Sequence, residues 1–249
     1  MNRNSVVMLP GLLEDAEVYA HQISGLAEVA DCIVADLTRS ETIEGLAHDV
    51  LAQAPERFAL VAHSMGGYVA LDIVRQAPQR VSALALLNTN ARADSAEATQ
   101  NRQRLIDLAA RDFAAVVATL LPKQVTAKSL ANTAITGTIT QMANAVGPEA
   151  FVRQQKAIMG RIDSRSRLAE IRCPTLVVAA RDDAIMPLEV LEEMANAIPG
   201  SRLVVIESCG HAATLEQPEA VTEALHEWVT GEPPHGPDVV AGTRRAPPA

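Results

Sequence analysis

Short apolar runs recur along this chain, with helix-forming segments between them. A run that is apolar at nearly every position is typical of a strand buried on both faces of a sheet, and a helix between successive strands makes those strands parallel. Six runs fit this description: Val6–Leu9, Cys32–Ala35, Phe58–Ala62, Ala83–Leu87, Thr175–Ala179 and Arg202–Ile206. Helices are expected over Ile43–Gln53, Tyr68–Gln76, Glu189–Ala197 and Ala220–Val229. The sequence therefore predicts an α/β protein with about six strands, all parallel and flanked by helices.

One long segment interrupts this alternation. Residues 93–165 carry amphipathic helical patterns but no run comparable to the strands, so we interpret them as an inserted group of helices. Breaks are expected at Pro122, Gly137 and Gly147-Pro148, because proline and glycine interrupt helices. They would divide the insertion into three or four helices that cover the crevice of the sheet as a cap.

The insertion divides the chain into three predicted parts. Residues 1–92 and 166–230 form the α/β core, and residues 93–165 form the helical cap. Residues 231–249 are rich in proline and glycine, a composition that cannot bury enough apolar surface to order itself. We expect this last segment to be a disordered tail.

The acidic charge balance limits the classes of partner. The 249 residues carry a formal net charge of −9 at pH 7, which argues against nucleic acid or an anionic membrane as the main partner. No apolar run approaches the roughly 20 residues that span a bilayer, and the apolar stretch near Met1 is too short for a secretory signal. We therefore expect a cytoplasmic protein with a small-molecule partner, and the composition leaves its oligomeric state open.

The three cysteines and the glycine pattern indicate neither a metal nor a nucleotide. Cys32, Cys173 and Cys209 lack the spacing of a metal site and cannot all pair, so reduced thiols are expected. Gly66-Gly67 belongs to no dinucleotide-binding or phosphate-binding loop motif. The sequence predicts no cofactor.

Ser64 occupies the most informative position in the chain. It lies between the apolar run Phe58–Ala62 and the helical run Tyr68–Gln76, as a serine does in a strand-to-helix nucleophile elbow. Open α/β sheets bind ligands at the carboxyl ends of their strands, where a helix amino terminus also offers free N–H groups. A serine hydroxyl still needs a base to take its proton and a group to orient that base.

Two later segments supply candidates for these partners. Asp182 and Asp183 follow the predicted strand Thr175–Ala179, and His211 follows the predicted strand Arg202–Ile206. The chain order serine, aspartate, histidine is that of the α/β-hydrolases. From position alone, either aspartate could orient the histidine.

The sequence thus resembles the α/β-hydrolase superfamily over residues 5–230, and in particular small bacterial capped serine esterases whose first strand runs into a segment like Leu9–Leu13. This resemblance implies that Ser64 is the nucleophile and that His211 acts first as general base and then as general acid. It implies Asp183 as the orienting carboxylate, because the family pattern Gly-x-x-Asp-x-x-x-Pro aligns its aspartate with position 183. Asp182 remains the alternative, as a loop acid or helix cap.

The same resemblance implies an oxyanion hole built from backbone N–H groups. One donor is Met65, directly after the nucleophile, and the other is Leu12, in the loop after the first strand. Pro10 has no N–H and replaces a histidine that is usual in the family. Alanine replaces the family's glycine at Ala62 and at Ala180.

These features predict a serine hydrolase that cleaves a carboxylic ester of a small or medium molecule through an acyl-enzyme on Ser64. The same triad also serves carbon–carbon bond hydrolysis, lactone opening, perhydrolysis and lyase reactions, because one fold hosts many chemistries. A non-catalytic ligand-binding protein on this fold is a further alternative. An impaired triad would be expected in that case, whereas here all three residue types are present.

Overall fold

A seven-stranded sheet with the order β2-β1-β3-β4-β5-β6-β7 lies at the centre of the computed structural model, which describes residues 3–231 and 240–241. Six of its strands are parallel: β1 (Asn4–Leu9), β2 (Ala30–Val34), β3 (Phe58–His63), β4 (Val81–Leu87), β5 (Thr175–Ala180) and β6 (Arg202–Ile206). Each lies at or close to a predicted run, so the predicted fold class is confirmed.

One short strand was not predicted. β7 (Val240–Ala241) pairs antiparallel with β6, with Ala241 opposite Arg202. It belongs to the segment 231–249 for which we predicted disorder. Apart from Gly231 and β7, that segment lies outside the described residues.

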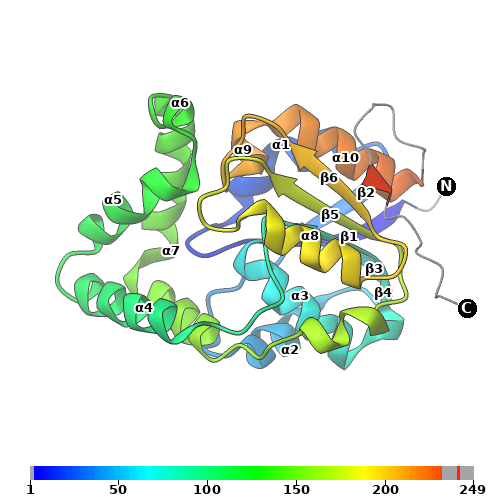
Figure 1. Ribbon diagram of the computed structural model, residues 1–249, viewed down its shortest axis with the longest axis horizontal. Helices are drawn as coiled ribbons and strands as arrows, with labels where there is room; N and C mark the ends of the chain where they lie inside the picture. The colour runs from blue at the N-terminus through cyan, green and yellow to red at the C-terminus, as the bar shows by residue number, and fades with distance from the viewer. Residues whose placement is uncertain (1–2, 232–239, 242–249) are drawn as a thin grey trace, which may run out of the picture.

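Helices cover both faces of the sheet. Figure 1 shows one layer above it and one below it. The first layer contains α1 (Ala20–Leu26), α9 (Ala213–Glu216) and α10 (Pro218–Thr230), and the second contains α2 (Ile43–Gln53), α3 (Met65–Gln76) and α8 (Leu188–Ala197). Short 3-10 helices span Ala16–Tyr19, Pro78–Arg80 and Arg165–Glu170.

The alternation of side chains along β3 explains its continuous apolar sequence. Leu60 and Ala62 pack in the core shared with α2, α3 and α8, whereas Ala59 and Val61 pack in the core shared with α1 and α10. Successive residues of a strand point to opposite faces, and both faces are covered here. Every residue of β3 is therefore buried.

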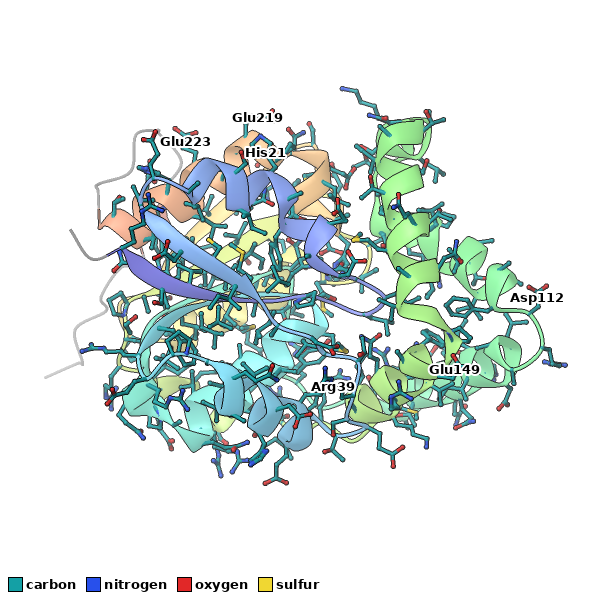
Figure 2. All side chains as sticks on the ribbon, turned by 180° about the vertical axis from the view of Figure 1, so that it is seen from behind. His21, Arg39, Asp112, Glu149, Glu219 and Glu223 are labelled. Atoms are coloured by element: carbon teal, nitrogen blue, oxygen red, sulfur yellow. The ribbon has the colours of Figure 1, made fainter. Side chains whose placement is uncertain are left out.

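The segment between β4 and β5 folds into α4 (Ala96–Ala109), α5 (Phe113–Gln124), α6 (Ala127–Leu130) and α7 (Thr133–Met159). Figure 1 shows these helices beside the core rather than on a face of the sheet. Asp112, which caps α5 by accepting a hydrogen bond from the N–H of Ala115 at 2.9 Å, lies at their outer end (Figure 2). Their apolar cluster, which includes Val116 and Phe151, also contains Leu13 of the loop after β1.

Two of the three predicted helix breaks in this segment are wrong. α5 continues through Pro122 to Gln124: the proline lies in the last turn, where it removes one i→i−4 hydrogen bond without ending the helix before Gln124. α7 continues through Gly137, which costs a helix only about 1 kcal/mol relative to alanine. Gly147 does break α7, with φ of 79° just before Pro148.

Candidate active site

Ser64 lies at the sharp turn between β3 and α3. Its φ of 50° and ψ of −115° form a backbone conformation that residues with a side chain rarely adopt and that costs roughly 1–3 kcal/mol. Two glycines allow the chain to pack closely enough to hold it: a Cβ on Gly66 would overlap the carbonyl of Leu9, and a Cβ on Gly67 would overlap the side chain of Thr89. The turn therefore projects the serine from the carboxyl end of β3.

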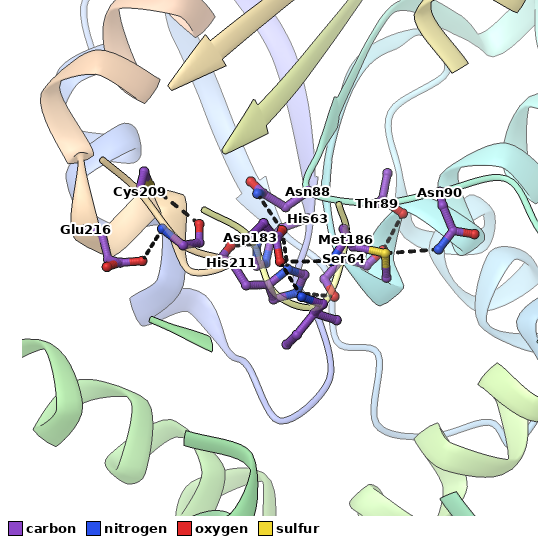
Figure 3. Close-up of polar contacts among 12 residues, drawn as sticks. His63, Ser64, Asn88, Thr89, Asn90, Asp183, Met186, Cys209, His211 and Glu216 are labelled. Carbon is purple, nitrogen blue, oxygen red and sulfur yellow. Dashed lines mark hydrogen bonds and ion pairs between the residues drawn. The ribbon is translucent and has the colours of Figure 1, made fainter. Parts of the chain in front are cut away.

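Ser64, His211 and Asp183 form a chain of hydrogen bonds (Figure 3). Ser64 Oγ lies 2.8 Å from His211 Nε2, and His211 Nδ1 lies 2.8 Å from Asp183 Oδ2. Because an ionised carboxylate can only accept, Nδ1 carries the proton and Nε2 is left to accept one from the serine hydroxyl. All three residues are buried, with 8% of Ser64, 4% of His211 and 6% of Asp183 exposed.

Asp183 is held as a carboxylate by four donors. Its Oδ1 accepts the N–H groups of Ile185 at 2.8 Å and Met186 at 2.9 Å, and its Oδ2 accepts the side-chain amide of Asn88 at 2.9 Å as well as His211 Nδ1. Burial opposes ionisation, but His211 and these donors outweigh it and lower the pKa of Asp183 below its ordinary value.

The neighbouring Asp182 occupies a different environment. Its side chain is exposed, and its backbone N–H donates to the carbonyl of Cys209 at 2.9 Å. The structure thus brings Asp183, and not Asp182, against His211.

The loop after β1 leaves one N–H group free between two that are bonded. The N–H of Gly11 donates to Glu14 Oε2 at 2.5 Å, and the N–H of Leu13 donates to Gln154 Oε1 at 3.1 Å. Among the described residues, the N–H of Leu12 has no acceptor, and neither does that of Met65 at the start of α3. These are the two N–H groups that the resemblance implied as oxyanion donors.

His63 lies buried beside Ser64 and joins two loops. Its Nδ1 lies 2.9 Å from Glu14 Oε2, and its Nε2 lies 2.9 Å from the carbonyl oxygen of His211. Since both ring nitrogens face acceptors, the doubly protonated ring suits this environment. Burial opposes a charge there, but Glu14 and the His211 carbonyl outweigh it and raise the pKa of His63.

Three residues that contact the candidate active site were not identified from the sequence. Asn88 bonds Asp183, Glu14 bonds His63, and Gln154 bonds the loop after β1. Asn88 carried a usable signal, because it directly follows the apolar strand β4, at the edge of the sheet where ligands bind. Glu14 and Gln154 carried none, since their contacts depend on packing between distant segments.

The described residues contain no group of three or more histidine, cysteine or acidic side chains arranged to hold a metal ion. Within the same residues, no helix is long and apolar enough to cross a membrane.

Comparison with known proteins places this geometry in a family. The family model described as the alpha/beta hydrolase fold matches residues 52–218. The pimeloyl-[acyl-carrier protein] methyl ester esterase of Aromatoleum aromaticum is 27% identical over 205 residues, which cover 78% of this chain and 82% of that protein.

Two solved structures are similar over nearly the whole chain. A thermophilic esterase from Thermogutta terrifontis superposes with a TM-score of 0.86 at 31% identity, covering 92% of this chain and 90% of that one. The enol-lactonase from Burkholderia xenovorans LB400 superposes with a TM-score of 0.85 at 24% identity, covering 92% of both chains, and this likeness shows the fold alone. From its matched residues and its fold, the chain belongs to the α/β-hydrolase family.

Proposed function

We propose that this protein is a serine hydrolase that cleaves carboxylic esters of small or medium molecules. The observation that carries the proposal is the hydrogen-bonded chain from Ser64 through His211 to Asp183, with distances of 2.8 Å at both links. This is the arrangement in which a base can take the hydroxyl proton while a carboxylate holds the base in the required tautomer.

The proposed reaction begins with attack of Ser64 Oγ on the ester carbonyl carbon. His211 Nε2 takes the hydroxyl proton, and the N–H groups of Leu12 and Met65 bind the negative oxygen that develops. The carbon–oxygen bond to the alcohol then breaks, and the imidazolium gives its proton to the leaving alkoxide. His211 then takes a proton from water, which attacks the carbonyl carbon of the acyl-enzyme. The bond from that carbon to Ser64 Oγ breaks, and His211 returns the proton to Oγ as the acid is released.

The helices over residues 93–165 are proposed as a cap that sets the size of the substrate. Leu13, which directly follows the proposed donor Leu12, packs in the apolar cluster of these helices with Val116 and Phe151. This packing holds the helices next to the proposed oxyanion donor, so they are close enough to limit the space that a substrate can occupy there. The names of two relatives, a methyl ester esterase and an esterase, support an ester as the bond cleaved.

The test is the steady-state hydrolysis of p-nitrophenyl esters from acetate to decanoate, together with labelling by a serine-directed phosphonate. Ser64→Ala is expected to lower kcat by at least about a thousandfold and to abolish labelling without loss of the fold, because triad members act as a unit. The optimum chain length would measure the acyl pocket. Labelling of Ser64 without ester turnover would indicate a different reaction, and absence of both would contradict the proposal.

A further inference from the structure

Gln154, on the inserted helix α7, reaches into the core beside the loop after β1. Its side chain is fully buried, with an exposed fraction of 0%. Its Oε1 accepts the N–H of Leu13 at 3.1 Å, and its Nε2 donates to the carbonyl of Leu37 at 3.2 Å. Both ends of this amide are thus bonded to backbone outside the insertion.

The contact lies next to the N–H group proposed to bind the oxyanion. Leu13 has a φ of 62°, a conformation that a leucine holds only where its surroundings impose it. Glu14 bonds the N–H of Gly11 on one side of Leu12, and Gln154 bonds the N–H of Leu13 on the other. The carbonyl of Gly11, in the same peptide plane as the Leu12 N–H, accepts the backbone N–H of Glu14 at 3.4 Å. The peptide planes on either side of it are restrained by Glu14 and Gln154, so Gln154 supplies a restraint on this loop that comes from the inserted helices.

We propose that Gln154 is a positioning residue that helps to orient the Leu12 N–H toward the oxyanion. The position of the inserted helices on the core would then contribute to stabilising the transition state. This inference rests on the proposed function. An oxyanion donor contributes only when it lies within hydrogen-bonding distance of the developing charge. Loss of Gln154 is therefore expected to reduce kcat rather than substrate binding.

The chain offers a matched control in the adjacent residue. Gln155 lies on the same helix and is also fully buried, with an exposed fraction of 0%. Its Oε1 accepts from Arg102 Nη1 at 2.9 Å, so this contact stays within the insertion. Replacing either glutamine by leucine removes one buried amide of the same size from α7, and only the first change touches the loop after β1.

The experiment measures kcat and KM for p-nitrophenyl butyrate with the wild type, Gln154→Leu and Gln155→Leu, at a temperature well below the lowest Tm. A trifluoromethyl ketone is measured as an inhibitor in parallel, because its adduct with Ser64 places an oxyanion in the hole. We expect Gln154→Leu to lower kcat about 10- to 100-fold, as a misplaced catalytic group does, and to weaken the inhibitor by a similar factor. KM should change little, and Gln155→Leu should retain wild-type kcat and inhibition.

Gln154→Asn and Gln155→Asn repeat the comparison if a leucine variant does not fold, since asparagine keeps the amide but withdraws it by one methylene. If the Gln154 and Gln155 changes have equal effects on kcat and on inhibition, the positioning role of Gln154 is overturned while the proposed function stands. A wild type that neither turns over esters nor reacts with a phosphonate would overturn the proposed function and this role with it.

Discussion

At the scale of single residues, Asp183 shows how a loop selects one of two adjacent acids. The strand β5 ends at Ala180, and the turn that follows directs Asp182 to solvent and Asp183 toward His211. The N–H groups of Ile185 and Met186 bind one oxygen, and the other accepts from Asn88 and from His211. The carboxylate is thus fixed in place before any substrate binds.

Exchanging each aspartate for asparagine separates their roles. Asp183→Asn is expected to lower kcat by about 10³- to 10⁴-fold, because the amide can donate to Nδ1 and so stabilise the wrong tautomer of His211. Asp182→Asn should stay within about threefold of the wild type, since surface changes away from a site have small effects. Steady-state kinetics on one ester measures both, and a larger loss in Asp182→Asn would reverse the assignment.

At the scale of elements, a buried pair links three strand ends. Glu14 follows β1, His63 ends β3, and the carbonyl that accepts from His63 belongs to His211, after β6. The same Glu14 oxygen also accepts the N–H of Gly11. The loops that carry the proposed base and a proposed oxyanion donor are therefore both held by one imidazole ring.

This pair should make stability depend on pH. Because folding raises the pKa of His63, its protonated form contributes stability fully below about pH 6.5, the ordinary histidine value, and the contribution is lost as pH rises through the raised pKa. Glu14→Gln should therefore destabilise the protein most at pH 5.5–6.5, by about 1.5–3 kcal/mol for a hydrogen bond to a charged group. The difference in unfolding free energy between the wild type and Glu14→Gln should become smaller toward pH 9.

Urea unfolding of the wild type and Glu14→Gln from pH 5.5 to 9 measures this difference. The matched control is Glu219→Gln, which removes the carboxylate 3.8 Å from the half-exposed His21 on neighbouring helices (Figure 2). Exposed pairs contribute little, so the control difference should stay flat. A flat difference for Glu14→Gln as well would refute a charged His63.

At the scale of the whole molecule, the two ends of the inserted segment are tied together by one buried acid. Asp94, just before α4, accepts from Arg161, just after α7, at 2.7 Å and from Arg102 of α4 at 3.2 Å. Its side chain is only 2% exposed. The Arg161 guanidinium also lies over the ring of Tyr68 on α3, at 4.4 Å from its centre, so the junction of the insertion is anchored to the core.

Asp94→Asn should destabilise the protein by about 3 kcal/mol, because removing one partner of a buried pair leaves the remaining charges unpaired. Asp163→Asn serves as the control, since its partner Arg165 is half exposed and exposed pairs are worth at most about 1 kcal/mol. Urea unfolding at pH 7 compares the two. Equal small effects would show that Asp94 does not hold the junction.

The core could be predicted from the sequence because strands covered on both faces produce continuous apolar runs. The start of α3 was harder to predict. The helix begins at Met65 and not at Tyr68. Gly66 and Gly67 are poor helix formers, so the sequence carries no helical signal there, but close packing requires glycine at both positions. Ser64, Asp183 and His211 could be placed by motif and strand end. Gln154 could not, since its partner lies 141 positions away and no local pattern encodes such a contact.

The inserted helices contact two loops of the candidate active site, the loop after β1 and the loop that carries His211, through their own backbone and side chains. The carbonyl of Gln124 accepts the N–H of Ala212, directly after His211, at 2.7 Å, and Glu216 accepts both the N–H of Thr126 and that of Gly210. Gln154 bonds the opposite loop. A chimera that receives this segment from a relative in order to acquire a new substrate range would therefore also exchange contacts that hold the proposed base and oxyanion loops, and we expect selectivity and turnover to be inherited together.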